Sequence, residues 1–504
     1  MQTQIEGVRL SPQQKHLWLL QTGEQHQPYR VQGAILIEGN LDLVILRKAL
    51  QNVVNRHEIL RTTFNYLPGM ELPVQVINDC YEIRCNELLE TKIESIFQEM
   101  LQWRFNFEKE PPLHLSIVRF SPEKSVMVIG LAAAIADKLT PINLVCEISC
   151  FYKACLQGEE ITESPMQYAD IAEWQNELLE ATDRETGRQY WQQPDIFSFL
   201  NERFPFERQY LDSVFQPKFI SFKIEPIYCQ KLAALAQNYD TSTSVLLLTC
   251  WQILLYRLLD RSDIIVGTEF DGRKYEELES ALGLFAKYLP LHCHLSSDRR
   301  FSQVVQQVKQ SVEDAYRWQE YFAWDRTPNS NKNAKELSFL PFCFDFAEIP
   351  AKYPVADVEF SIIQQYTCID RFKIKLSCFG GDNSLNAEFH YDANSFLEND
   401  IKRLAGQFQT LLESAVKNPE TAISELEILT ENEQQQLIVE FNKTQTDYPK
   451  DKCIHQLFES QVKQTPDNIA VVFENRKLTY RELNKRANQL AHYLQQLGVK
   501  PEVL

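Results

Sequence analysis

The chain has 504 residues and a formal net charge of −18 at pH 7. It is too long for one hydrophobic core, so we expect about two to four structural units. Its content of 44% hydrophobic and 11% aromatic residues argues against overall disorder. The acidic charge, which no cluster of lysines and arginines interrupts, excludes nucleic acids and anionic membrane surfaces as partners.

We predict a cytoplasmic, monomeric protein without a metal site. The polar N-terminus lacks the apolar stretch of a signal peptide, and the longest apolar run, residues 245–259, is shorter than the ~20 residues of a membrane span. The 12 cysteines are therefore expected as reduced thiols, in spacings that match no zinc motif. His292 and His294 lack a nearby third ligand, so we interpret them as surface residues. Neither a P-loop nor a dinucleotide-binding glycine motif is present, which predicts no bound nucleotide.

The first part of the sequence alternates helical and strand patterns. Residues 41–56 carry apolar side chains at helical spacing behind Asp42, a suitable helix cap. The apolar run at residues 125–134 predicts a buried strand that carries the loop 135–140 to an interior site. A helix is expected behind this loop at residues 144–156.

The second part repeats the mixed pattern with more strands. We predict strands at residues 219–224, 263–267, 339–346, 358–364, 372–378 and 385–391, and helices at 241–259, 301–316 and 401–416. Two successive mixed blocks indicate an α/β protein with two lobes of similar size. We place the first lobe at residues 1–180 and the second at 181–430. A polar linker at 431–450 and a small α/β fragment at 451–504 follow.

Five short strings in the first 430 residues occur in the order of the signature motifs of one family. They are residues 10–18 (LSPQQKHLW), 56–64 (RHEILRTTF), 168–175 (YADIAEWQ) with 190–191 (YW), 266–268 (VGT) with 272–273 (GR) and 283–285 (GLF), and 318–321 (WQEY). Together they resemble the condensation domains of nonribosomal peptide synthetases. Residues 478–483 (LTYREL) and 487–491 (ANQLA) resemble the first core motif of adenylation domains. We therefore expect a fragment of a longer synthetase that ends just inside the next domain.

This resemblance implies a fold and a set of partners. Condensation domains consist of two chloramphenicol-acetyltransferase-like lobes in a V arrangement. A tunnel between the lobes admits the phosphopantetheine arms of carrier domains from both faces. The expected partners are therefore peptidyl carrier domains and the adjacent adenylation domain. The expected cofactor is the phosphopantetheine of those carriers, and none is expected to be bound by the chain itself.

One motif departs from the family pattern. The family has His-His-x-x-x-Asp-Gly, whose second histidine is thought to position or deprotonate the attacking amine, whereas residues 132–138 read AAAIADK. Ala132 and Ala133 replace the two histidines and accept no proton. Loss of a positioned general base typically costs about 10²–10⁴-fold in rate. Lys138 replaces the glycine, and we interpret it either as a solvated lysine at a helix start or as a side chain that partly plugs the tunnel.

Other site positions also follow from the resemblance. Asp137 is retained, and the family pattern predicts that it forms a buried salt bridge with Arg61 behind the motif. Breaking such a pair costs about 3–5 kcal/mol, so its retention protects the fold whether or not chemistry survives. The remaining predicted site residues line the tunnel or carry the signature of the second lobe: Arg273, Gly283, Lys287 and Tyr288.

These departures leave two functional hypotheses open. In the first, the domain is not an enzyme and acts as a structural spacer or as a platform that recruits a tailoring enzyme to carrier-bound intermediates. In the second, it joins carrier-bound acyl and aminoacyl thioesters, either by positioning alone or through a replacement group such as Tyr288 or Lys138. An engineered knockout would explain the alanines but not Lys138, Lys287 and Tyr288. The sequence favours the first hypothesis and identifies neither the substrates nor a tailoring partner.

Overall fold

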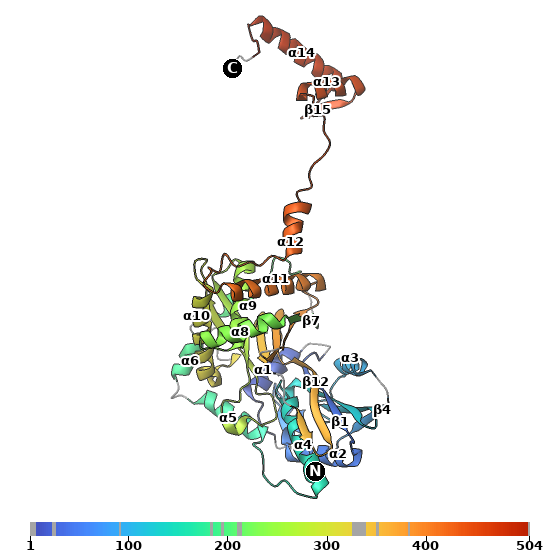
Figure 1. Ribbon diagram of the computed structural model, residues 1–504, viewed down its shortest axis with the longest axis vertical. Coiled ribbons are helices and arrows are strands. Elements are labelled where there is room, and N and C mark those ends of the chain that lie inside the picture. Colours follow the sequence, from blue (N-terminus) through green and yellow to red (C-terminus); the bar gives the residue numbers. More distant parts are fainter. Residues whose placement is uncertain are drawn as a thin grey trace. The chain divides into compact units, whose positions relative to one another are not determined.

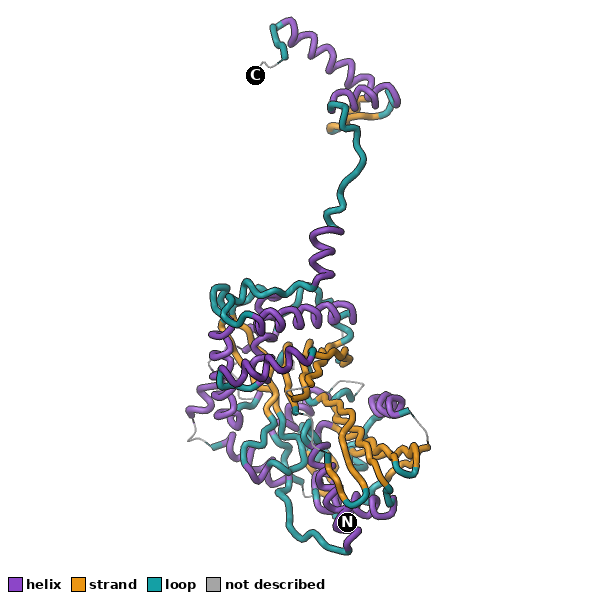
Figure 2. Tube along the Cα trace, viewed as in Figure 1, coloured by secondary structure: helices purple, strands orange, loops and turns teal. Residues whose placement is uncertain are grey.

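The computed structural model describes residues 7–22, 27–89, 92–181, 185–192, 196–208, 214–324, 339–348, 352–381 and 384–501. The chain divides into two units, Met1–Thr430 and Glu431–Leu504, and Figure 1 labels many of their helices and some of their strands. The strands of the first unit gather mainly into two six-stranded sheets, which are coloured orange in Figure 2. Each sheet is the centre of one lobe.

The first sheet has the strand order β11-β12-β1-β6-β5-β4. Its strands are β1 (Arg30–Gly39), β4 (Cys85–Leu89), β5 (Leu113–Ser121), β6 (Lys124–Ala132), β11 (Tyr353–Val355) and β12 (Val358–Cys368). The helices of this lobe are α1 (Pro12–Gln21), α2 (Leu43–Arg56), α3 (Ile93–Gln102), α4 (Thr140–Gln157) and α5 (Tyr168–Glu180). A small hairpin of β2 (Thr62–Asn65) and β3 (Val74–Ile77) accompanies them.

Helices cover both faces of the first sheet, which explains why its central strand β6 is apolar along nearly its whole length. A side chain at Gly33 of β1 would meet Pro141 of α4, whereas one at Gly130 of β6 would meet Met100 of α3. Gly130 pairs with the residue before Gly33, so these two glycines face opposite sides of the sheet. The predicted strand at residues 125–134 and the predicted helix capped by Asp42 are both confirmed.

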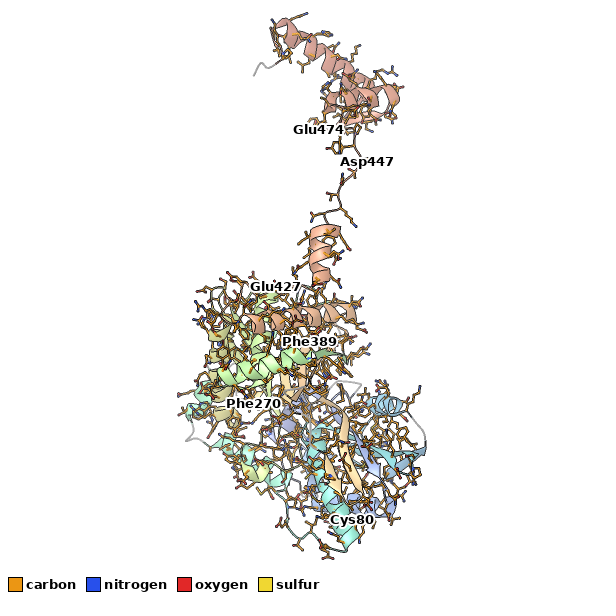
Figure 3. All side chains as sticks on the ribbon, in the orientation of Figure 1. Cys80, Phe270, Phe389, Glu427, Asp447 and Glu474 are labelled. Atoms are coloured by element: carbon orange, nitrogen blue, oxygen red, sulfur yellow. The ribbon has the colours of Figure 1, made fainter. Side chains whose placement is uncertain are left out.

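The second sheet has the order β7-β14-β13-β10-β8-β9. Its strands are β7 (Pro217–Ile224), β8 (Asp263–Phe270), β9 (Lys287–His294), β10 (Phe342–Ala347), β13 (Ile374–Gly381) and β14 (Ser384–Asp392). Its helices are α6 (Glu185–Gln192), α7 (Ile196–Leu200), α8 (Pro226–Asn238), α9 (Thr243–Leu259), α10 (Phe301–Trp318) and α11 (Glu398–Lys417). Phe389 of β14, labelled in Figure 3, packs against Trp251 of α9 and Phe408 of α11, so one face of this sheet is an apolar helix-covered core.

One strand crosses between the lobes and corrects the predicted boundary. The sequence analysis assigned residues 358–364 to the second lobe, at 181–430, but β12 pairs antiparallel with β1 of the first sheet from Arg30↔Cys368 to Gly39↔Val358. Without β12, the backbone groups on that edge of β1 would have no strand partner. Strand periodicity identifies the strand but not the sheet that it joins, so the pattern alone misplaced it.

The second unit contains α12 (Glu431–Gln435), the π-helical turn Gln436–Glu440, α13 (Ile454–Gln464), β15 (Ile469–Phe473), β16 (Arg476–Thr479) and α14 (Tyr480–Gln496). The predicted linker thus begins as a short helix. Thr479 caps α14 through a capping box with Glu482. Many apolar side chains of the unit are exposed, including Ile454 at 87% and Phe473 at 69%. The unit therefore has no closed core of its own.

In the described part of the chain, no single helix has the length and apolar character to cross a membrane. Among the described residues, only the pair of α8 and α9 is long and apolar enough when the two helices are taken together, and these helices are bent by 102° relative to each other.

Gly283 marks the point where three of the signature strings pack together. Its φ is +143°, and a Cβ at this position would lie 2.1 Å from Cδ2 of Tyr168. The Tyr168 hydroxyl donates to the carbonyl of Leu284 at 2.7 Å and lies 2.8 Å from the hydroxyl of Ser11. The glycine is required here by both backbone conformation and space.

We expect Gly283→Ala to lower the free energy of unfolding by about 3 kcal/mol, because backbone strain and a clash with Tyr168 act together. Gly158→Ala is the matched control, since Gly158 also has a positive φ, of +71°, but nothing lies within 4 Å of its virtual Cβ. That variant should lose only about 1 kcal/mol. Urea denaturation followed by tryptophan fluorescence measures both, and equal losses would contradict the packing role of Gly283.

Candidate functional site

Residues 132–138 form the turn between β6 and α4. Strand β6 ends at Ala132, a short 3-10 turn covers Ala133–Ile135, and α4 begins at Thr140. The backbone amide of Ala133 donates to the carbonyl of Tyr29 at 3.2 Å. Ala132 and Ala133 are fully buried, at 0% exposure. Their methyl groups fill space but can neither donate nor accept a proton.

Asp137 forms a salt bridge with Arg273 of the second lobe, and this corrects the predicted partner. The two guanidinium nitrogens Nη1 and Nη2 of Arg273 donate to Oδ2 and Oδ1 of Asp137 at 2.7 and 3.0 Å. The backbone amides of Phe285 and Ala286 donate to Oδ2 at 2.9 and 3.1 Å. The side chains of the pair are 0% and 2% exposed. This is a bidentate, fully desolvated pair with additional donors, the arrangement that makes a buried charge tolerable.

Arg61, the partner expected from the sequence, does not contact Asp137. Its guanidinium donates to the carbonyl of Asn78, and its Nη2 lies 3.5 Å from a carboxylate oxygen of Glu58. The Arg61 side chain is 15% exposed and stays within the first lobe. Asp137 faces the loop of the second lobe instead, so the prediction of an Arg61–Asp137 pair is wrong.

Lys138 reaches across to the second sheet. Its ammonium group donates to Oδ1 of Asp345, on β10. Gln365 of β12 donates to the backbone carbonyl of Lys138 at 2.5 Å, so the residue is held from both sheets. The Lys138 side chain is 14% exposed and that of Asp345 is 2% exposed. Lys138 is therefore not a solvated lysine, and the structure favours the interpretation in which it plugs the interior.

Asp345 belongs to a polar row that crosses the second sheet. The strand registers pair Tyr288 with Glu269, and they place Asp345, Ser377, Glu388 and Ser221 side by side. Strands β10 and β8 pair in parallel up to Phe344 and Thr268, so Asp345 and Glu269, the next residues, align and complete a row across six strands. Cross-strand neighbours share a face, and Phe389, next to Glu388, points to the helix-covered side. The row therefore lies on the opposite face, which Lys138 of the first lobe approaches.

Asp345 interacts with a hydroxyl group and two ammonium groups beside it. The Ser377 hydroxyl donates to Oδ1 of Asp345 at 2.6 Å, and the Lys375 ammonium lies 3.1 Å from Oδ2. Burial alone would raise the pKa of Asp345, but the two ammonium groups of Lys138 and Lys375 outweigh it and hold that pKa well below its usual value. Asp345 is thus a permanent anion between two lysines.

Glu269 behaves differently from Asp345. Burial raises the pKa of its carboxyl group to about 7, against the opposing attraction of Lys138 and with the added repulsion of Asp345. The Tyr288 hydroxyl donates to Oε2 of Glu269 at 3.0 Å. Burial, and then the nearby Glu269, raises the pKa of Tyr288 well above its usual value. Of the two, only Glu269 can exchange a proton near neutral pH.

Lys287, which precedes Tyr288 in the second-lobe signature, is nearly buried, and its Nζ atom lies 3.7 Å from Oε2 of Glu320. Burial lowers the pKa of its ammonium group. Lys287 and Tyr288 also line a cavity of about 40 Å³ between the lobes, with room for only a few water molecules. His16 of α1 closes one side of this cavity, where it pairs with Asp370 at 3.2 Å.

His292 and His294 lie at the surface, as predicted, with side chains that are 40% and 55% exposed. Both imidazoles lie 2.9 Å from Oδ1 of Asp263. Across the residues described above, no cluster of three or more His, Cys, Asp or Glu side chains is arranged to hold a metal ion.

Comparison with known families now identifies this architecture. The family model of the condensation domain matches residues 4–438. The chain belongs to the condensation-domain family. The family model of the AMP-binding enzymes matches residues 458–503, so the start of an adenylation-type domain follows.

The curated relatives are peptide synthases. Gramicidin S synthase 2 of Brevibacillus brevis is 31% identical over 502 residues, and bacitracin synthase 3 of Bacillus licheniformis is 30% identical over 509 residues. These alignments cover 98% and 99% of this chain but only 11% and 8% of the relatives. The chain thus corresponds to a small part of each synthase.

Solved structures confirm the predicted two-lobed α/β fold class. The X-domain from teicoplanin biosynthesis superimposes with a TM-score of 0.72 at 22% identity, over 85% of this chain and 99% of that chain. A condensation domain from monacolin K polyketide synthase gives 0.73 at 17% identity, over 83% and 99%. A four-domain nonribosomal peptide synthetase bound to AMP and glycine gives 0.76 at 17% identity, over 98% of this chain and 39% of that chain.

Sequence analysis located part of this condensation-domain site and missed the rest. It named Arg273 as a signature residue without its partner, and it named Lys138 and Tyr288 without the groups that they contact. It interpreted Asp345 as a packing or surface residue, and it did not name Glu269 or Lys375. The available signal was a charged residue inside an otherwise apolar strand, as in FCFDFA at residues 342–347, because a buried charge requires a partner.

The observed and expected partners of Asp137 can be separated by one matched pair of variants. Arg273→Met leaves the buried carboxylate of Asp137 without its counter-ion, and we expect the free energy of unfolding to fall by about 3–5 kcal/mol. Arg61→Met removes a hydrogen bond from a partly exposed side chain, and about 1 kcal/mol should be lost. Chemical denaturation of both variants measures the difference. A larger loss for Arg61→Met than for Arg273→Met would restore the pairing expected from the sequence.

Proposed function

We propose that this domain is not a standard amide-bond catalyst and that it serves as a structural spacer or recruitment platform for carrier-bound intermediates. The observation that carries the proposal is the closed centre. Ala132 and Ala133 supply no proton acceptor, and the ammonium group of Lys138 is paired with Asp345 across the lobe interface. A reacting amine would therefore find neither a base nor free space beside the motif.

The partners in this proposal are carrier domains, the adjacent adenylation domain and a tailoring enzyme. Carrier domains would supply the phosphopantetheine arms, and the chain itself would bind no cofactor. The match at residues 458–503 supports the adenylation neighbour. The X-domain from teicoplanin biosynthesis, whose fold is similar, has been solved in a complex with OxyB. That complex supports recruitment, because it shows that this two-lobed architecture can present a protein-binding surface.

Glu269 supports the second candidate function, an active condensation or acyl-transfer catalyst. Its carboxyl group, whose pKa burial raises to about 7, lies on the interior face of the second sheet. A general base works best when its pKa lies near the working pH. Glu269 is thus a better replacement base than Tyr288, whose pKa is raised, or Lys138, whose ammonium group is held by Asp345.

Intact-protein mass spectrometry of the acceptor carrier tests the two candidates. Given a panel of aminoacyl-loaded donor and acceptor carriers, the unmodified chain should form amide bonds no faster than the same carriers without it. Ala133→His alone should not restore a normal rate, because Lys138, Lys287 and Tyr288 still alter the interior.

A catalytically active condensation domain assayed with the same carriers provides the positive control. Rapid dipeptide formation by the unmodified chain would overturn the non-catalytic proposal. In that event Glu269→Gln separates the alternatives: a loss of about 10²-fold or more would assign the base to Glu269, whereas an unchanged rate would point to positioning alone.

A further inference from the structure

The two consecutive residues Asp137 and Lys138 connect the lobes in different ways. Asp137 is sealed in a pair with Arg273, whose side chains are 0% and 2% exposed, and it also accepts backbone hydrogen bonds from the second lobe. The Lys138 side chain is 14% exposed. Among the carboxylates of the described residues, only that of Asp345 lies within salt-bridge distance of the Lys138 ammonium group. The Asp137–Arg273 pair is expected to stay closed, because breaking it would leave a buried charge unpaired.

The Lys138 connection can open without that penalty. If the Lys138 side chain withdraws, Asp345 keeps the Lys375 ammonium at 3.1 Å from Oδ2 and the Ser377 hydroxyl at 2.6 Å from Oδ1. The carboxylate therefore stays paired and hydrogen-bonded. The lysine itself, already partly exposed, would regain water and side-chain freedom, which partly offsets the lost ion pair.

We propose that the Lys138–Asp345 ion pair is a latch, which holds the polar face of the second sheet against the motif loop and closes the interior between the lobes to ligands. This inference rests on the proposed function and deepens it, because it supplies a mechanism by which the interior is kept closed. Release of Lys138 uncovers the row formed by Glu269, Asp345 and Ser377 without disturbing the Asp137–Arg273 pair.

The chain contains its own reporters for this opening. Cys343 lies two residues before Asp345 on β10 and pairs in register with Lys375, so it shares the face of the polar row. Cys378 follows Ser377 on β13 and therefore points to the opposite, helix-covered face. Both thiols are buried, at 1% and 0% exposure. Burial raises the pKa of each well above its usual value, so the two start from a similarly low reactivity.

The experiment compares N-ethylmaleimide labelling of Cys343 and Cys378 by peptide-resolved mass spectrometry in the full chain. Lys138→Met removes the charge and keeps the bulk of the side chain, whereas Lys138→Arg keeps the charge and serves as the matched control. We expect Lys138→Met to label Cys343 about tenfold faster than the unmodified chain, with Cys378 unchanged within about twofold. Lys138→Arg should label like the unmodified chain.

Two results overturn the latch. Unchanged labelling of Cys343 in Lys138→Met would show that the ion pair does not close the interior. A parallel rise at Cys343 and Cys378 would show general loosening of the lobe instead of a local opening. Neither result depends on amide formation, so failure of the latch and failure of the proposed function are distinguishable: the latter appears as dipeptide formation by the unmodified chain in the carrier assay.

Discussion

The carboxylate of Asp137 connects the two lobes of the unit Met1–Thr430 through hydrogen bonds to both. It sits at the end of the motif loop of the first lobe, where it accepts from Leu139 and Thr140 at the start of α4. From the other side it receives the Arg273 guanidinium and two backbone amides of the second lobe. A buried charge is tolerated only when its donors are in place. The motif loop, the helix behind it and the signature loop of the second lobe must therefore be assembled together.

Neighbouring positions of the motif loop meet different structural demands. Asp137 is fixed by its buried partners, whereas Ala132 and Ala133 present buried methyl groups that neither donate nor accept a hydrogen bond. The side chain at position 138 lies between the lobes and needs a partner there. Lysine at position 138 fits because Asp345 offers a partner on the facing sheet. Residues one position apart in this loop thus connect the lobes through different partners.

Sequence reasoning predicted much of the fold because its signals were local or collective. The apolar run that became β6 and the cap at Asp42 depend on neighbouring residues, and the family followed from several motifs in order. The errors concern long-range pairing. A retained Arg61 does not reveal which way Asp137 faces, and the alternation in β12 does not reveal which sheet it joins. The polar row could not be predicted from the sequence, because its members come from six strands that only the folded sheet brings together.

The most direct test of the account is a crystal structure of this chain at about 2 Å resolution, with attention to the interior beside the motif loop. We expect the Lys138 Nζ atom to lie within about 4 Å of the Asp345 carboxylate, with Ala133 shielded from solvent. A Lys138 side chain directed into bulk water, with a continuous opening that reaches Ala133 from both faces, would contradict the closed interior on which the proposed function and the latch depend.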